Sequence, residues 1–154
     1  MTRFLGLHGA NGIVTHVARF VCGGRDYEVT LNPVAQENVY DCSFVFPNEF
    51  SFSKQGCYEV VFDLASNIRA KTPFARAGTG SFLGRAVLRH VESIINDHYT
   101  QFNVGMYFFF PDDDSLARVY QRIIAKRFSS DLTLEMGFNP GRRGNVLRTS
   151  NCYR

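Results

Sequence analysis

The sequence predicts an α+β fold, with a mainly antiparallel sheet of about five or six strands and two helices packed on it. Three observations lead to this prediction. Short stretches in the first 64 residues alternate apolar with polar residues, two later stretches repeat apolar residues every three or four positions, and a continuously apolar run lies between those two. The predicted order of elements is therefore β-β-β-β-α-β-α-β.

Four antiparallel strands are expected in the first 64 residues. Residues 13–21 and 25–32 flank the sequence CGGR, whose two glycines are typical of a tight hairpin turn. Residues 40–46 and 57–64 follow, and apolar side chains alternate through the first of these runs. The four runs together predict a sheet of neighbouring, oppositely directed strands.

A connecting loop and a helix are expected next. Residues 65–80 have no sustained period and contain one proline and two glycines, so they form the longest irregular segment and a candidate functional loop. From Phe82 to about His98 apolar residues recur with helical spacing, and Thr79 or Ser81 can cap the start of this helix.

An interior strand, a second helix and a last strand complete the predicted fold. Residues 104–110 are continuously apolar, as in a strand that is covered on both faces. The sequence PDDD then favours a helix start, because the positive end of a helix stabilises negative charge. The expected inner face of this second helix consists of Leu116, Tyr120, Ile123 and Ile124. Residues 131–137 alternate again and are expected to form the last strand.

Size and composition are those of an ordinary globular domain, with 154 residues, 45% of them hydrophobic and 20% charged. We expect one domain over residues 1–154, in which residues 138–154 form a basic C-terminal tail. No run approaches the roughly 18 apolar residues of a membrane span, and the first residues lack the order of a secretion signal. The expected location is cytoplasmic, without membrane contact.

The positive charge is concentrated in the last quarter of the chain. Residues 115–154 contain eight Lys and Arg against two Asp and Glu, within a net charge of +3. Arg118, Arg122 and Lys126 are four residues apart and line one helix face, as Arg85 and Arg89 do on the first helix. Further cations are Arg142, Arg143, Arg148 and Arg154. We expect a non-catalytic recognition protein that binds a protein or nucleic acid through this basic face; a merely solvated basic face is the alternative.

The stretch GTGSFLGRAVLRHV allows two interpretations. Gly78, Thr79, Gly80 and Ser81 precede a helix, where backbone N–H groups and the helix dipole could hold a phosphate. The same residues could simply bend the loop and cap the helix. The stretch contains neither the GK[ST] of a Walker loop nor a GxGxxG sequence.

The order of glycine loop, helix, interior strand and Tyr-bearing helix over residues 76–128 resembles the GNAT superfamily of N-acetyltransferases. This resemblance implies a divergent acetyl-CoA-dependent N-acetyltransferase, in which Gly78, Thr79, Gly80 and Ser81 hold the acetyl-CoA pyrophosphate. It also implies that Tyr120 protonates the departing thiolate and that Glu59 or Asp63 serves as base. The sequence departs from the family pattern: Arg76 is one residue too close to Gly78, an Asp replaces the Asn before the second helix, and no Gly-Phe follows Tyr120.

A second resemblance is to small uncharacterised bacterial and phage proteins. It is carried by TGSFLGRAVLRHVESII and ARVYQRIIAKRF, and it implies an accessory protein of a mobile element without a stated activity. On this interpretation no cofactor is expected.

The remaining chemistry-bearing residues are interpreted structurally. Cys42 and Cys57 lie in alternating strands and are expected in the core as reduced thiols, whereas Cys152 is expected to be exposed. No metal site is expected, because the histidines lack ligand spacing and PDDD is explained by the helix start. Phe50 and Phe52 belong either to the core or to an exposed patch that supports a homodimer.

Overall fold

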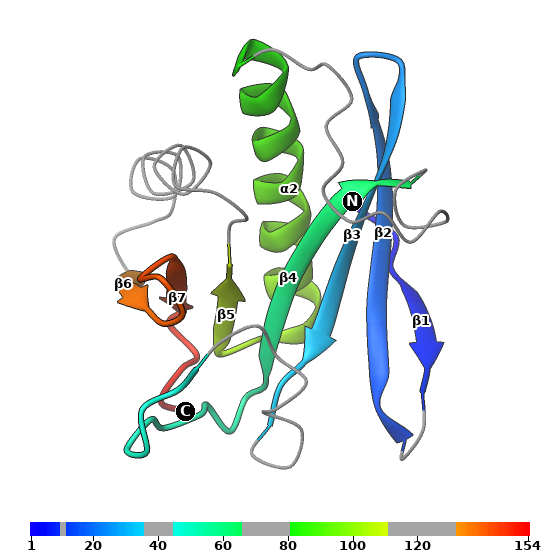
Figure 1. The fold of residues 1–154 in the computed structure, drawn as a ribbon. Helices are drawn as coiled ribbons and strands as arrows, with labels where there is room; N and C mark the ends of the chain where they lie inside the picture. Colours follow the sequence, from blue (N-terminus) through cyan, green and yellow to red (C-terminus); the bar gives the residue numbers. More distant parts are fainter. Residues whose placement is uncertain (10–11, 36–44, 66–80, 111–131) are drawn as a thin grey trace.

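The structure is a computed structural model that describes residues 1–9, 12–35, 45–65, 81–110 and 132–154. These residues form one seven-stranded mixed sheet with the order β1-β2-β3-β4-β5-β7-β6. A long helix, α2, lies against one face of this sheet (Figure 1). No helix in the described part of the chain is both long and apolar enough to cross a membrane.

The first four strands form an antiparallel meander, in which β2, β3 and β4 correspond to three of the four predicted strands. They span Leu5–His8 (β1), Val14–Cys22 (β2), Arg25–Pro33 (β3) and Cys57–Leu64 (β4). The turn between β2 and β3 consists of Gly23 and Gly24, with φ angles of 59° and 74°. Two consecutive positive φ angles are what a two-residue hairpin turn requires, and glycine adopts them without strain. Strand β1 was not predicted, because it is only four residues long and lies exposed at the sheet edge.

The chain then crosses over from β4 to a parallel neighbour. The next described element is α2 (Ser81–Phe102), and the chain returns to the sheet as β5 (Met106–Phe109), which pairs with β4 in parallel. The predicted helix is confirmed, since Val87, Val91 and Ile95 are buried at helical spacing. Strand β5 is buried on both faces, which agrees with its continuously apolar sequence.

The predicted C-terminal tail is wrong. Gly144–Arg148 form strand β7, which lies between β5 and β6 (Thr133–Phe138) and pairs with both. Val146 and Leu147 are at most 1% exposed and point to opposite faces of the sheet, so each enters a different core. This strand was not predicted because five residues give little periodic pattern, and because Arg142, Arg143 and Arg148 made the segment resemble a basic tail.

Two cores cover the two faces of the sheet. The core under α2 contains Val29, Leu31, Val60 and Tyr107, together with the inner face of the helix. The opposite core is aromatic and centres on Phe108, which is fully buried. Phe46, Phe50 and Phe52 pack on Phe108 with ring centroids 5.0 to 6.1 Å away. Of the two interpretations of Phe50 and Phe52, the structure therefore supports the core.

The predicted fold class needs correction. The described residues form seven strands in one mixed sheet and one helix, α2, whereas five or six mainly antiparallel strands and two helices were expected. Strand direction depends on how the chain returns to the sheet, which the alternating pattern does not record. The helix expected from Pro111 lies outside the described residues. So does most of the strand expected at 40–46, of which Val45 forms an isolated bridge to Asn139.

Candidate functional site

Among the described residues, the sheet opens at the carboxyl end of β4, where β4 extends past its parallel neighbour β5. The parallel pairing of β4 with β5 ends at Val60 and Phe109, but β4 continues to Leu64 while still paired with β3. Four residues of β4 thus extend beyond the last β5 pair. Figure 1 shows β5 ending lower than β4, whose upper end leans away from it.

Helix α2 begins at this same end of the sheet. Its first turn is at the upper end in Figure 1 and lies above the end of β4. The first turn contains no acidic residue, so no side chain there neutralises the positive end of a 22-residue helix. Arg85 is exposed in the second turn and adds positive charge. Ends of strands that precede a crossover helix are common ligand sites, and a helix start of this kind favours an anion.

Two carboxylates of β4 lie on the sheet face opposite α2. Glu59 is 4% exposed and lies beside Phe108 of β5 within the paired part of the strand. Asp63 is half-buried beyond the last β5 pair, and its Oδ1 accepts a hydrogen bond from the N–H of Leu64 at 2.7 Å. Because alternate strand residues share a face, both carboxylates are on the same side of the opening. They are the two candidate bases that the acetyltransferase resemblance implies.

Several predicted site residues lie outside the described residues. These are Gly78, Thr79, Gly80, Tyr120, Arg118, Arg122 and Lys126. Ser81 is the first residue of α2. The structure therefore leaves the loop and the second basic helix as predictions.

The described arginines do not form one uniform basic face. Arg85 and Arg89 are exposed on α2, one turn apart. Arg142 is exposed in the turn before β7, whereas the guanidinium carbon of Arg143 lies 5.4 Å from the centre of the Phe110 ring. Arg148 donates a hydrogen bond to Glu135 at 2.6 Å. The cations of α2 are thus available to a partner, while some of the C-terminal cations are engaged within the fold.

The two buried thiols, Cys57 and Cys152, are poor nucleophiles. Cys57 is 3% exposed, as predicted for a core residue, and burial raises its pKa to about 11. The prediction that Cys152 is exposed is wrong: it is 4% exposed in the aromatic core, and burial raises its pKa as well. Cys42 lies outside the described residues. A thiol held protonated in this way does not support nucleophilic catalysis at neutral pH.

A buried histidine pair was missed by the sequence interpretation. Nε2 of His98 lies 2.7 Å from Nδ1 of His16, and Nδ1 of His98 lies 2.9 Å from the Tyr107 hydroxyl. Burial, and then the neighbouring His16, lower the pKa of His98 to about 3; burial also lowers the pKa of His16. His98 is therefore neutral at physiological pH. Its place three residues after Ile95 on the apolar helix face was the available signal, because a polar residue on such a face needs a buried partner.

Within the described ranges, no group of three or more His, Cys, Asp and Glu is arranged to hold a metal ion. The aspartates of PDDD are outside these ranges. Comparison of the chain with protein families, curated proteins and solved structures gave no match.

Proposed function

We propose that the chain is an acyltransferase that uses acetyl-CoA or a related acyl-CoA to modify an amine. One observation carries this proposal: β4 and β5 are adjacent and parallel, their pairing ends before β4 does, and the helix between them begins beyond this same end of the sheet. The order of helix α2 and interior strand β5 agrees with the acetyltransferase resemblance, whose glycine loop lies outside the described residues. It supports the enzyme over the non-catalytic protein that the sequence favoured.

The charge around the opening suits the expected ligand. The first turn of α2 has no carboxylate, and Arg85 follows it, so a pyrophosphate at this helix start would meet positive charge and no carboxylate of the first turn. Gly80 precedes the helix and Ser81 is its first residue. The backbone N–H groups of these two residues would hold the pyrophosphate. Acyl-CoA supplies the activated thioester.

Residues of the chain would then accept and donate the protons that the acyl transfer requires. Glu59 or Asp63 would accept a proton from the attacking ammonium group, which leaves a nucleophilic amine. The amine nitrogen forms the new bond to the acyl carbon as the carbon–sulfur bond breaks. Tyr120, if it has the role that the resemblance implies, would return a proton to the departing thiolate.

Acetyl-CoA should stabilise the protein against heat. At a concentration of about 100 times the Kd, mass action stabilises the folded state by about 2.7 kcal/mol, which corresponds to roughly 5–10 °C in Tm for a chain of this size. Differential scanning fluorimetry with acetyl-CoA measures this shift. Gly80→Asp adds a negative charge at the helix start and should abolish the shift, whereas the uncharged Gly80→Asn should retain most of it.

Two results would contradict the proposed function. One is the absence of any shift for the wild-type protein at millimolar acetyl-CoA. The other is an equal shift for the wild-type and Gly80→Asp proteins, because bound pyrophosphate and the added carboxylate should repel each other.

A second candidate is the recognition protein that binds a polyanion through Arg118, Arg122, Lys126 and the cations of α2. The exposure of Arg85 and Arg89 on neighbouring turns favours it. On this proposal the protein is an accessory factor without catalysis. Its ligand would contact the outer face of the helices rather than the opening of the sheet.

Charge reversal on α2 tests this second candidate. Arg85→Glu combined with Arg89→Glu should weaken binding to a labelled DNA duplex, and the slope of log K against log salt should fall by about 0.9 for each phosphate that the variant no longer neutralises. Fluorescence anisotropy at several salt concentrations gives both quantities. Arg25→Glu combined with Lys54→Glu, at two exposed positions outside the proposed face, is the matched control. Unchanged affinity and slope in the double variant would exclude this face.

A further inference from the structure

Strand β2 is longer than its neighbour at the sheet edge. The pairing of β1 with β2 ends at Leu5 and Val17, but β2 runs on to Cys22. Residues 18–22 pair with β3 on one side. On the other side they have no strand partner in the described part of the chain, and an uncovered edge of this kind can pair with another chain.

The register shows which backbone groups face this open edge. The N–H of Gly9 donates to the C=O of Ile13 at 2.8 Å. Hydrogen-bonded pairs recur at every second residue of an antiparallel ladder. Counting from Gly9 and Ile13 along the register gives Leu5 and Val17 as such a pair. The next residues of β2 with the same direction are Arg19 and Val21, so their N–H and C=O groups point away from β3.

The hairpin turn gives the same result independently. Gly23 and Gly24 form a two-residue turn that closes on the pair Cys22 and Arg25. The residues flanking such a turn bond to each other. Cys22 and Phe20 therefore direct their backbone groups to β3, which again leaves Arg19 and Val21 facing outward.

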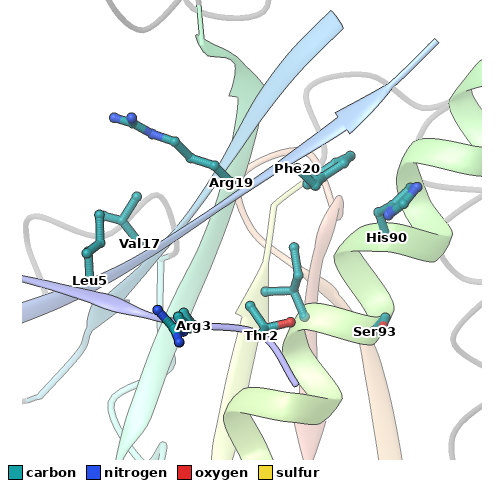
Figure 2. Close-up of a pocket in the computed structure, with 9 residues that line it drawn as sticks. Thr2, Arg3, Leu5, Val17, Arg19, Phe20, His90 and Ser93 are labelled. Carbon is teal, nitrogen blue, oxygen red and sulfur yellow. The ribbon is translucent and has the colours of Figure 1, made fainter. Parts of the chain in front are cut away.

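A hollow of about 450 Å³ adjoins this open edge. It exists because the N-terminal residues leave the sheet before Leu5 and cross to α2: the N–H and hydroxyl of Thr2 donate to Oδ2 of Asp97 at 2.9 and 2.7 Å. Figure 2 shows the hollow between Thr2 and Arg3, Phe20 of β2, and His90 and Ser93 of α2.

The lining of the hollow is basic and partly apolar. Arg3, Arg19 and His90 supply its ionisable groups, and none of its lining residues is an Asp or a Glu. The Phe20 ring stacks on His90 at 4.8 Å and forms an apolar wall. Arg19 donates from Nε to Glu28 at 3.1 Å, yet its side chain remains 69% exposed. Arg19 and Val21 lie on the sheet face opposite to Phe20, and Val21 is 62% exposed beside this edge.

We propose that an acidic peptide segment of a partner protein binds here in extended form, as an added strand on residues 18–22 of β2. Arg19 and Val21 would exchange main-chain hydrogen bonds with it, and alternate side chains of the peptide would enter the hollow. Carboxylates of the peptide would meet Arg3, Arg19 and His90. A second copy of β2 suits these cations less well, because its residues 18–22 contain no Asp or Glu.

Peptide display tests the proposal without a known partner. A library of random peptides of about twelve residues, selected on the wild-type protein, should yield acidic peptides that are rich in β-branched residues. Binding of a synthetic copy of a selected peptide should slow hydrogen exchange at the amides of Arg19 and Val21. Val21→Pro removes an outward N–H without breaking the ladder to β3 and should weaken binding by about tenfold or more.

Two further variants keep the test decisive. Val21→Thr retains the N–H and should bind like the wild-type protein, and Arg3→Glu should lose the preference for acidic peptides without altering the edge. Failure to select any peptide, or equal binding by wild-type and Val21→Pro, would overturn the proposal. A concentration-dependent dimer that Val21→Pro dissociates would also overturn it, in favour of a second copy at this edge. Because the edge is distinct from the opening at β4, none of these results depends on acyl-CoA binding.

Discussion

His98 is a polar residue in the centre of an apolar contact surface, and its surroundings explain how this is tolerated. Both ring nitrogens have partners, since the Tyr107 hydroxyl and Nδ1 of His16 lie within 2.9 Å. The rings of Phe4, Tyr58 and Phe102 surround it, with centroids within 5.0 Å. Loss of a partner would leave a buried polar atom unsatisfied, at a cost of about 1–3 kcal/mol. The pair therefore connects the end of α2 to β2 and β5.

The depressed pKa of His98 predicts acid sensitivity. The folded state holds His98 neutral down to a pKa of about 3, whereas the unfolded chain binds a proton near 6.5. Stability is therefore complete above pH 6.5 and falls as the pH decreases toward 3, by up to about 1.4 kcal/mol per pH unit for each proton. Urea unfolding between pH 7 and 4 measures this decline, which His98→Gln should make shallower.

His90 provides the control for this prediction. It is exposed on the same helix, so His90→Gln controls for the replacement of a histidine of α2 by glutamine. A decline of equal slope in the His98→Gln protein would show that other groups cause the acid sensitivity.

Among the elements, β7 has the largest effect on the architecture. It separates β6 from β5 and joins both by antiparallel pairing, so the C-terminal hairpin extends the sheet. Thr149 follows the strand, and its hydroxyl donates to the C=O of Val104 at 2.6 Å. This bond ties the end of β7 to the segment that leads into β5.

Truncation of a β7 side chain tests whether residues 144–148 form a buried strand or an exposed tail, through the stability of the protein. Leu147 is 1% exposed in the core under α2, so Leu147→Ala should reduce the free energy of unfolding by about 2–5 kcal/mol. Denaturant unfolding gives this value directly. Arg154→Ala, at an exposed position, should change it by less than about 0.5 kcal/mol. Equal stability of the two variants would be incompatible with β7 in the core.

At the scale of the whole molecule, the two proposed sites lie in different parts of one sheet. The opening at the end of β4 results from a parallel crossover in the sheet interior, and the hollow beside β2 results from a short edge strand. Neither site is formed by residues that are close in the sequence. An acyl-CoA site and a peptide site could therefore be occupied together, which would suit an enzyme that docks its protein substrate away from the reacting amine.

Local sequence patterns determined most elements of this protein. Alternation predicted β2, β3, β4 and β6, helical spacing predicted α2, and the apolar run predicted β5, because each pattern reflects which side of its own element is buried. Glu59 was also named from the sequence as a candidate base, although its burial was not.

Tertiary structure decided the rest, because the remaining features depend on contacts between distant residues. The direction of β5, the insertion of β7, the burial of Cys152 and the pairing of His16 with His98 leave no periodic trace in the sequence. Each of these features depends on where the chain re-enters the sheet. That position is selected by how much apolar surface the whole fold buries rather than by the local preference of the residues. The sequence alone thus determined the elements, and packing across the sheet decided their order and the sites between them.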